Sequence, residues 1–194
     1  MDEEAATREK KVLSILAQEL EDGESLAAEA RKMIFYLLTE KKGYQPEDIE
    51  KNVIFKVTLG EEISYSSADF VVSVAGKRSM LIKCSSGSLS SRERQAVAAA
   101  RLLGSSPLPV AVVADPVNAE VLDVATGEVT GEGFGAIPVR EQLVKMVSEH
   151  QPVQFSAARL EKEKRILLAF DAIRCCVPQG ADGYGVSLKG PGQE

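Results

Sequence analysis

Apolar residues recur at helical spacing through the first forty positions. One helix is predicted over about residues 3–21, with the aliphatic positions Val12, Ile15, Leu16 and Leu20. Gly23 then suits a helix end and Ser25 a new N-cap, so a second helix is expected to run to about Lys42. The apolar stripe of this second helix consists of Leu26, Ala30, Met33, Ile34, Leu37 and Leu38.

Beyond Gly43 the apolar period changes from helical to alternating, which is typical of strands. Strands are predicted over about residues 53–58, 68–74 and 80–84. The short turn at Gly76-Lys77 joins the last two as a hairpin.

The second half of the chain alternates between helical and strand patterns. Ser90-Ser91-Arg92-Glu93 has the form of a capping box and predicts a helix that ends at Gly104. The apolar run Pro107–Ala114 predicts a strand buried on both faces. The other expected elements are a strand near 120–124, a glycine-rich loop over 126–135, and helices from Pro138 to His150 and over about 156–176. The order helix, strand, strand, strand, helix, strand predicts a mixed α/β sheet.

Composition narrows the classes of protein and of chemistry. No apolar run approaches the roughly eighteen residues of a membrane span. The N-terminus is acidic, unlike a secretory signal, and the three cysteines have no metal-ligand spacing, so a cytoplasmic protein with reduced thiols is expected. The single histidine, His150, lies at a predicted helix end, a common structural position, which leaves carboxylates, lysine and a hard metal ion as candidate chemistry.

The charge is unevenly distributed. The net charge of −6 argues against a protein that coats nucleic acid. Six basic residues against Glu93 nevertheless give the stretch from Lys77 to Arg101 a charge of +5, and the rest of the chain carries −11. This strip is either a phosphate-facing surface or the solvated face of a helix.

The predicted hairpin brings a carboxylate and an ammonium together. A turn at Gly76-Lys77 pairs residues whose numbers sum to about 152, so Asp69 and Lys83 should lie opposite each other or miss by one position. Such a pair either helps to hold a divalent cation and orient a water molecule, or forms a cross-strand salt bridge.

The order of these elements, together with their residues, resembles the N-terminal domain of type I restriction enzyme R subunits, within the PD-(D/E)XK nuclease superfamily. The resemblance covers about residues 25–130 and rests on Glu29-Ala30-Arg31, Gly43-Tyr44, Ala68-Asp69-Phe70-Val71-Val72, Leu81-Ile82-Lys83, Gln95 and Arg101-Leu102-Leu103-Gly104. It implies a restriction-endonuclease-like mixed sheet with an αβββαβ core. The expected divisions are an N-terminal helix (1–24), the core (25–135), C-terminal helices (136–178) and a flexible tail (179–194).

The resemblance also implies roles for individual residues. Asp69 matches the metal-binding aspartate of the second core strand, and Lys83 matches the lysine that positions the attacking water. Glu29 matches an acidic residue on the first helix that supports the metal site, so Asp69 and Glu29 are the expected Mg²⁺ ligands. Gln95 matches a glutamine that some members point at the site or at DNA.

Two departures from the family pattern bear on cleavage. Leu81 stands where the family has the acidic residue two positions before the lysine, and Ala99 stands where a tyrosine often follows the glutamine. Because a catalytic Mg²⁺ is usually held by one or two carboxylates, losing one should weaken its binding greatly. Glu29 either supplies the missing carboxylate or is a plain residue at the edge of an apolar stripe.

The turn between the third strand and the following helix is a candidate phosphate contact. Ser86 lies in a small-residue loop, and Arg92 and Arg94 follow it. Backbone N–H groups at a helix N-terminus bind phosphate, but the same sequence also suits an ordinary loop.

Three hypotheses therefore stand. The first is a degenerate nuclease fold that serves as a DNA-contacting or assembly module. The second is an active endonuclease, with Mg²⁺ held by Asp69 and Glu29. The third is a protein-interaction domain without nucleic acid. The apolar stripes of the terminal helices also make a homodimer plausible, and no membrane association is expected.

Overall fold

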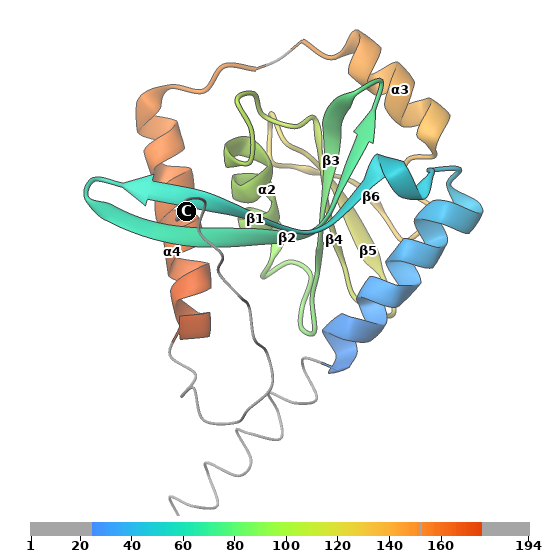
Figure 1. Cartoon of the computed structure of the whole chain (residues 1–194), viewed down its shortest axis with the longest axis horizontal. Helices are drawn as coiled ribbons and strands as arrows, with labels where there is room; N and C mark the ends of the chain where they lie inside the picture. Colours follow the sequence, from blue (N-terminus) through green and yellow to red (C-terminus); the bar gives the residue numbers. More distant parts are fainter. Residues whose placement is uncertain (1–24, 152, 176–194) are drawn as a thin grey trace, which may run out of the picture.

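The computed structural model describes residues 25–151 and 153–175, which form a six-stranded mixed sheet with helices on both faces (Figure 1). Its strand order follows the chain, and only β3 and β4 pair in parallel. The strands are β1 (Ile49–Leu59), β2 (Glu62–Val74), β3 (Lys77–Cys84), β4 (Val110–Ala114), β5 (Ala119–Asp123) and β6 (Val129–Glu132). The predicted helix over 3–21 and the tail over 179–194 lie outside the described residues.

The helices follow the predicted order. A first helix (residues 25–36) continues as a π-helical turn, Leu37–Lys41, and a 3-10 turn, Pro46–Asp48, precedes β1. The later helices are α2 (Glu93–Leu102), α3 (Arg140–Glu149) and α4 (Ala157–Cys175). Within the part of the chain that the structure describes, no helix is both long and apolar enough to cross a bilayer.

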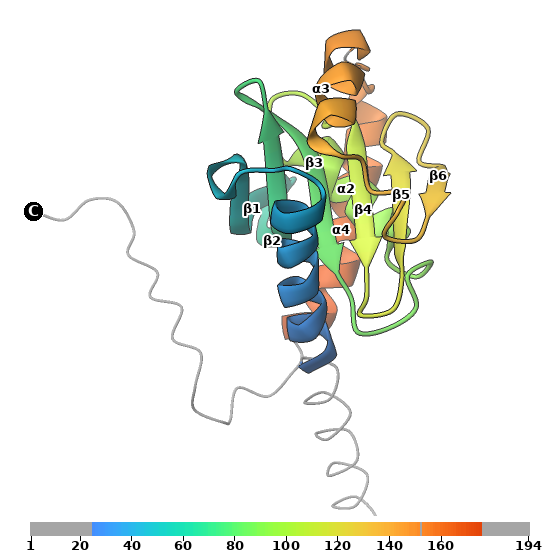
Figure 2. The same cartoon turned by 90° about the vertical axis from the view of Figure 1, so that its right-hand side faces the viewer.

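The sheet lies between two layers of helices (Figure 2), and an apolar cluster fills the space on each of its faces. On one face the first helix and α3 cover β2, β3 and β4, with Ile34 and Leu143 among the buried residues. On the other face α2 packs against the sheet, and α4 contributes Leu167 to the same cluster. All five residues of β4 are buried, which confirms the prediction of a strand covered on both faces.

The helix α2 is buried because it lies between the sheet and α4. Four alanines, Ala96 and Ala98 to Ala100, are fully buried within it. Small side chains let a helix approach its neighbours closely, so most of the surface of α2 is covered. Only the first turn of α2, with the exposed Arg94, presents surface to a partner, since Gln95 to Arg101 are buried.

The β1–β2 hairpin changes face along its length. Phe70 packs in the layer of the first helix, whereas Ala68, two residues earlier, packs in the layer of α2 and α4. The switch falls at Asp69, opposite Asn52, whose φ of 51° is in the left-handed region. Beyond this point the hairpin projects past the sheet and runs beside α4 (Figure 1).

Three local predictions are wrong. Ser90 does not cap α2: the helix begins at Glu93, and the carbonyl of Leu89 accepts the N–H groups of Arg92 and Glu93. The predicted loop over 126–135 contains β6, which pairs with β5. The buried stripe of the first helix is rotated from the predicted one and consists of Ala27, Ala30, Ile34 and Leu38, while Leu26 is exposed.

Candidate functional site

The predicted register of the β2–β3 hairpin is confirmed. Phe70 pairs with Ile82 and Val71 with Leu81, so paired residue numbers sum to 152. Asp69 and Lys83 are the next residues on the two strands beyond the pair Phe70 and Ile82. The two candidate residues therefore lie on neighbouring strands at one level of the sheet.

The carboxylate of Asp69 is bound by groups of the protein itself. Its Oδ2 accepts a hydrogen bond of 2.7 Å from the backbone N–H of Cys84. Its Oδ1 forms an ion pair with the guanidinium of Arg31, at 3.2 Å. The observed ion pair of Asp69 is therefore with Arg31, whereas the sequence suggested a cross-strand salt bridge with Lys83. The positive charge of Arg31 offsets the negative charge of Asp69 that would attract a metal ion.

Lys83 is turned back onto the backbone of β2. Its Nζ donates a 2.6 Å hydrogen bond to the carbonyl of Ser67, and the residue is 4% exposed. An ammonium in this position stabilises the local strand structure. It presents little surface to an incoming phosphate.

Leu81, where the resemblance implies an acidic residue, lies in the apolar core. Leu81 is 0% exposed and packs with Val71, Ala111 and the alanines of α2. A carboxylate in this layer would lose its hydration without a polar partner, which is costly. The leucine is therefore part of the core of the protein.

Glu29 does not accompany Asp69. It is exposed, and it lies two residues before Arg31 on the first helix, which is about 200° around a helix. Arg31 contacts Asp69 at the edge of the buried stripe, so Glu29 projects toward the solvent side. The sequence did contain a signal for this ion pair: Arg31 directly follows Ala30, which lies on the apolar face that the first helix packs against the sheet.

Gln95 is covered by α4. It is 1% exposed, and its amide Nε2 donates to Oδ1 of Asp171 at 3.0 Å. Arg92 extends this cluster with a 3.4 Å contact to Gln95 and with its guanidinium 5.8 Å above the ring of Phe170. Sequence reasoning missed Asp171. The sequence contained one signal for this contact. Glu163, Leu167 and Asp171 are spaced by four residues, so the two acids share a helix face with an apolar residue that is expected to be buried.

These donors do not fit the Mg²⁺ site that the resemblance implies. Asp69 already has a guanidinium and an N–H group as partners, Leu81 offers no oxygen, and Glu29 points elsewhere. Among the described residues, no group of three or more His, Cys, Asp and Glu side chains could hold a metal ion.

The basic strip is not a single surface. Lys83 and Arg101 are buried, and Arg78 forms a bidentate ion pair with Glu50. Arg94 is exposed and lines a hollow of about 270 Å³ together with Arg159 and Glu163, among other residues.

The candidate phosphate loop remains exposed at Ser86. Much of the loop's hydrogen bonding is internal. Ser85 bonds Gly87, Ser88 bonds Ser90, and Ser91 donates to the carbonyl of Ser88. Ser86 lies within this loop, and the exposed Arg94 lies in the first turn of α2, which follows the loop.

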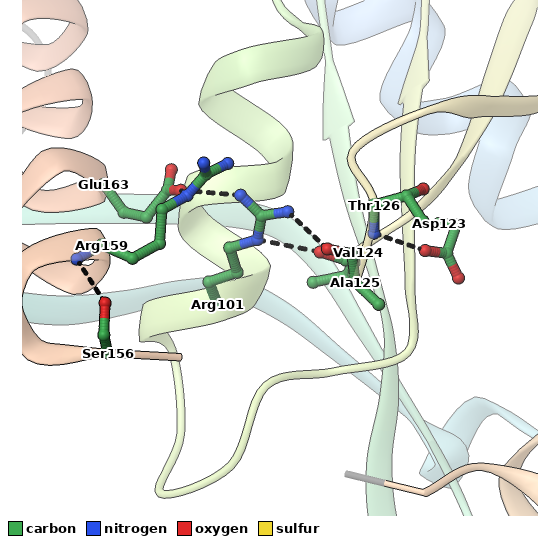
Figure 3. A network of polar contacts seen from close by, with 8 residues as sticks. All are labelled: Arg101, Asp123, Val124, Ala125, Thr126, Ser156, Arg159 and Glu163. Atoms are coloured by element: carbon green, nitrogen blue, oxygen red, sulfur yellow. Dashed lines mark hydrogen bonds and ion pairs between the residues drawn. The ribbon is translucent and has the colours of Figure 1, made fainter. Parts of the chain in front are cut away.

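A buried ionic network fixes α4 on α2 (Figure 3). Arg101 pairs with Glu163 at 2.6 Å, and both side chains are 2% exposed. Arg101 also donates to the carbonyls of Val124 and Ala125. Arg159, on the exposed side, pairs with the same oxygen of Glu163 at 2.6 Å. The network joins α2, α4 and the segment after β5.

We expect Cys84 to be chemically inert in the folded protein. Burial, with a further contribution from the nearby Asp69, raises the pKa of its thiol, so the reactive thiolate is scarce near pH 8. In a chain carrying Cys175→Ser and Cys176→Ser, a thiol-specific dye should react only after unfolding. Adding Ser86→Cys, two residues away and exposed, should give immediate labelling. Rapid labelling of Cys84 in the native control would contradict this prediction.

Comparison with known families identifies the matching region of the chain. The model described as type I restriction enzyme R protein N terminus matches residues 28–138, more than half of the chain. Comparisons with curated proteins and with solved structures gave no match. The matched region runs from the first helix past β6, and so contains Asp69, Lys83 and Gln95. The chain belongs to the family of type I restriction enzyme R protein N-terminal domains.

Proposed function

We propose that this protein is a restriction-endonuclease-like module that contacts DNA and does not cleave it. Its family relates it to restriction enzymes. In this proposal the fold derives from a PD-(D/E)XK nuclease. The residues of its cleavage centre now have a structural role.

The state of Asp69 carries the proposal. Both of its carboxylate oxygens are bound by groups of the protein, Arg31 and the N–H of Cys84. The acid that would share a metal ion with it is replaced by the buried Leu81. A water-activating metal needs open coordination positions and a negatively charged donor set, and neither is supplied here.

The support for DNA contact is the exposed end of α2. Arg94 faces solvent there, and Arg159 of α4 lines the same hollow with a half-exposed side chain. Guanidinium groups suit phosphate oxygens because their N–H donors are arranged as a fork. Because the whole chain carries −6, such contact would be local and sensitive to salt.

Replacing Arg94 with alanine is expected to weaken DNA binding about fivefold at low salt and to reduce the salt slope by about 1, the effect of one lost phosphate contact. Fluorescence anisotropy with a labelled duplex, titrated at several salt concentrations, measures both quantities. Lys41→Ala is the matched control, because Lys41 is an exposed cation on the first helix, which covers the other face of the sheet. Equal affinities for the Arg94 variant and the parent would remove Arg94 from the interface.

A plasmid cleavage assay with Mg²⁺ and with Mn²⁺ separates the rival functions. The proposal expects binding without nicking. Nicking that is abolished by Asp69→Ala and by Lys83→Ala would establish an active nuclease instead. Absence of any DNA binding at low salt would point to a module that recognises only proteins.

A further inference from the structure

Asp171 of α4 is a buried acid without a cation directly beside it. The residue is 8% exposed, and none of the ion pairs among the described residues includes it. Its Oδ1 accepts a hydrogen bond from Gln95, whereas its Oδ2 is buried without a hydrogen-bond partner among the same residues. A carboxylate that loses its hydration is costly unless donors or a positive charge compensate it. A compensating charge is therefore expected close by.

Gln95 connects Asp171 to a cation of the α2 N-terminus. An ionised carboxylate can only accept hydrogen bonds, so the amide of Gln95 turns its Nε2 toward Asp171, at 3.0 Å. The amide oxygen Oε1 then faces Arg92, whose guanidinium donates to it over 3.4 Å. The order carboxylate, amide, guanidinium has one direction, because each group offers what the next one requires. The orientation of the amide thus depends on the acid.

A second contact with α4 lies against the same guanidinium. The guanidinium carbon of Arg92 is 5.8 Å from the centre of the Phe170 ring, within the range of cation–π attraction. Phe170 and Asp171 are adjacent near the end of α4, so one short stretch contacts Arg92 directly through the ring and indirectly through Gln95. Two such contacts reduce the number of rotamers open to Arg92 before any ligand binds.

Arg92 lies where the proposed DNA contact requires a cation. It follows the loop that contains the exposed Ser86 and precedes the turn of α2 that carries Arg94. The residue is half-buried, and a guanidinium has five N–H donors, of which Gln95 uses one. An ordered guanidinium binds a phosphate more tightly than a mobile one, because less side-chain entropy is lost on binding.

We propose that Asp171 positions Arg92, through Gln95, for contact with a DNA phosphate. This inference rests on the proposed function, since it takes DNA contact as given and adds Arg92 to the contacting surface. Asp171 lies beyond residue 138, so a helix outside the family match would organise the phosphate-facing surface of the family domain. Gln95, to which the resemblance gave a place in the site, is in this proposal a positioning residue.

The Asp171→Asn variant tests the proposal, because positioning and charge predict opposite results. Asparagine keeps the shape of the side chain, but its own amide can donate, so the Gln95 amide can turn and withdraw its acceptor from Arg92. Loss of one negative charge would by itself favour DNA binding. The proposal expects instead that the variant binds a labelled duplex about threefold more weakly at low salt, as measured by fluorescence anisotropy.

Two comparisons isolate the role of Arg92. In an Arg92→Ala background, Asp171→Asn should have no further effect, because the residue that it positions is gone. Glu161→Gln is the matched charge control, since Glu161 is an exposed acid on the same helix, and its affinity should not fall. Tighter DNA binding by the Asp171→Asn protein overturns the proposal, and so do additive effects of Asp171→Asn and Arg92→Ala.

A measurement without DNA separates this inference from the proposed function. The Nε–H resonance of Arg92, identified by its loss in the Arg92→Ala protein, should have a high heteronuclear NOE that falls in the Asp171→Asn protein. The corresponding value for Arg101, which Glu163 holds, should not change and so verifies that α4 remains docked. An unchanged NOE for Arg92 overturns the positioning role. If the NOE falls but the parent binds no duplex at low salt, the proposed function fails, and the phosphate role of Arg92 fails with it.

Discussion

Replacing Glu163 with alanine is expected to lower the free energy of unfolding by about 3–5 kcal/mol. Arg101 would remain buried without its carboxylate, and its carbonyl acceptors at Val124 and Ala125 cannot neutralise the charge. Breaking one side of a buried pair is costly for this reason, even where the intact pair adds little net stability. Urea unfolding followed by circular dichroism measures the loss.

Arg159→Ala provides the matched control for this prediction. Arg159 pairs with the same oxygen of Glu163, but its side chain is 49% exposed. Solvent screens such a pair, so the expected loss is about 1 kcal/mol or less. Similar losses for the two variants would mean that the buried pair is not what holds α4 on α2.

Replacing Leu81 with glutamate is expected to destabilise the protein by about 4 kcal/mol or more and to produce no cleavage. The substitution puts an acidic residue at position 81, where the resemblance to the nuclease superfamily implies one. In the structure it places a carboxylate between β3 and α2, among Val71, Ala111 and alanine side chains. Asp69 would still be held by Arg31, so a second acid alone would not create a metal site.

The destabilisation of the Leu81→Glu protein should grow as pH rises. Burial raises the pKa of the new carboxyl in the folded state, while the unfolded chain titrates near the ordinary value of about 4.3. Above that pH the unfolded state releases the proton more readily, so the folded state loses stability up to the raised pKa. Leu81→Met, of similar volume, should cost less than about 1.5 kcal/mol at all pH values. Cleavage by the Leu81→Glu protein, or a pH-independent loss, would contradict this account.

The first of these predictions concerns how α4 is joined to the family domain. Helix α4 lies beyond the matched family region, which ends at residue 138. It nevertheless covers Gln95 through Asp171 and anchors Arg101 through Glu163. The segment outside the family match is thus part of the core on which the candidate site rests.

Much of the fold follows from local patterns. The alternation over residues 53–58 and 68–74 predicted strands, and the turn at Gly76 fixed the pairing of β2 with β3. The apolar run before Ala114 predicted a central strand. These elements are predictable because side-chain period and turn chemistry depend on neighbours in the chain. The strand β6 was missed because its residues, Val129–Glu132, are mostly exposed and have no apolar alternation.

The candidate site was predicted only in outline. The sequence predicted that Asp69 and Lys83 lie opposite each other or one position apart, and they directly follow the observed pair Phe70 and Ile82. It did not specify that Arg31 would bind Asp69 or that Asp171 would bind Gln95, since these contacts join residues 38 and 76 positions apart. Nor did it separate buried cations from exposed ones, so Arg101 and Arg94 were counted in one basic strip.

The sequence by itself determined the order of the elements, the register of one hairpin and the family. Only the tertiary structure decided which charges meet: Arg31 with Asp69, Glu163 with Arg101, and the ammonium of Lys83 with a backbone carbonyl. The physical reason is that periodicity and turn geometry act between near neighbours. Burial, and with it the need of each charge for a partner, is set by how distant helices cross the sheet.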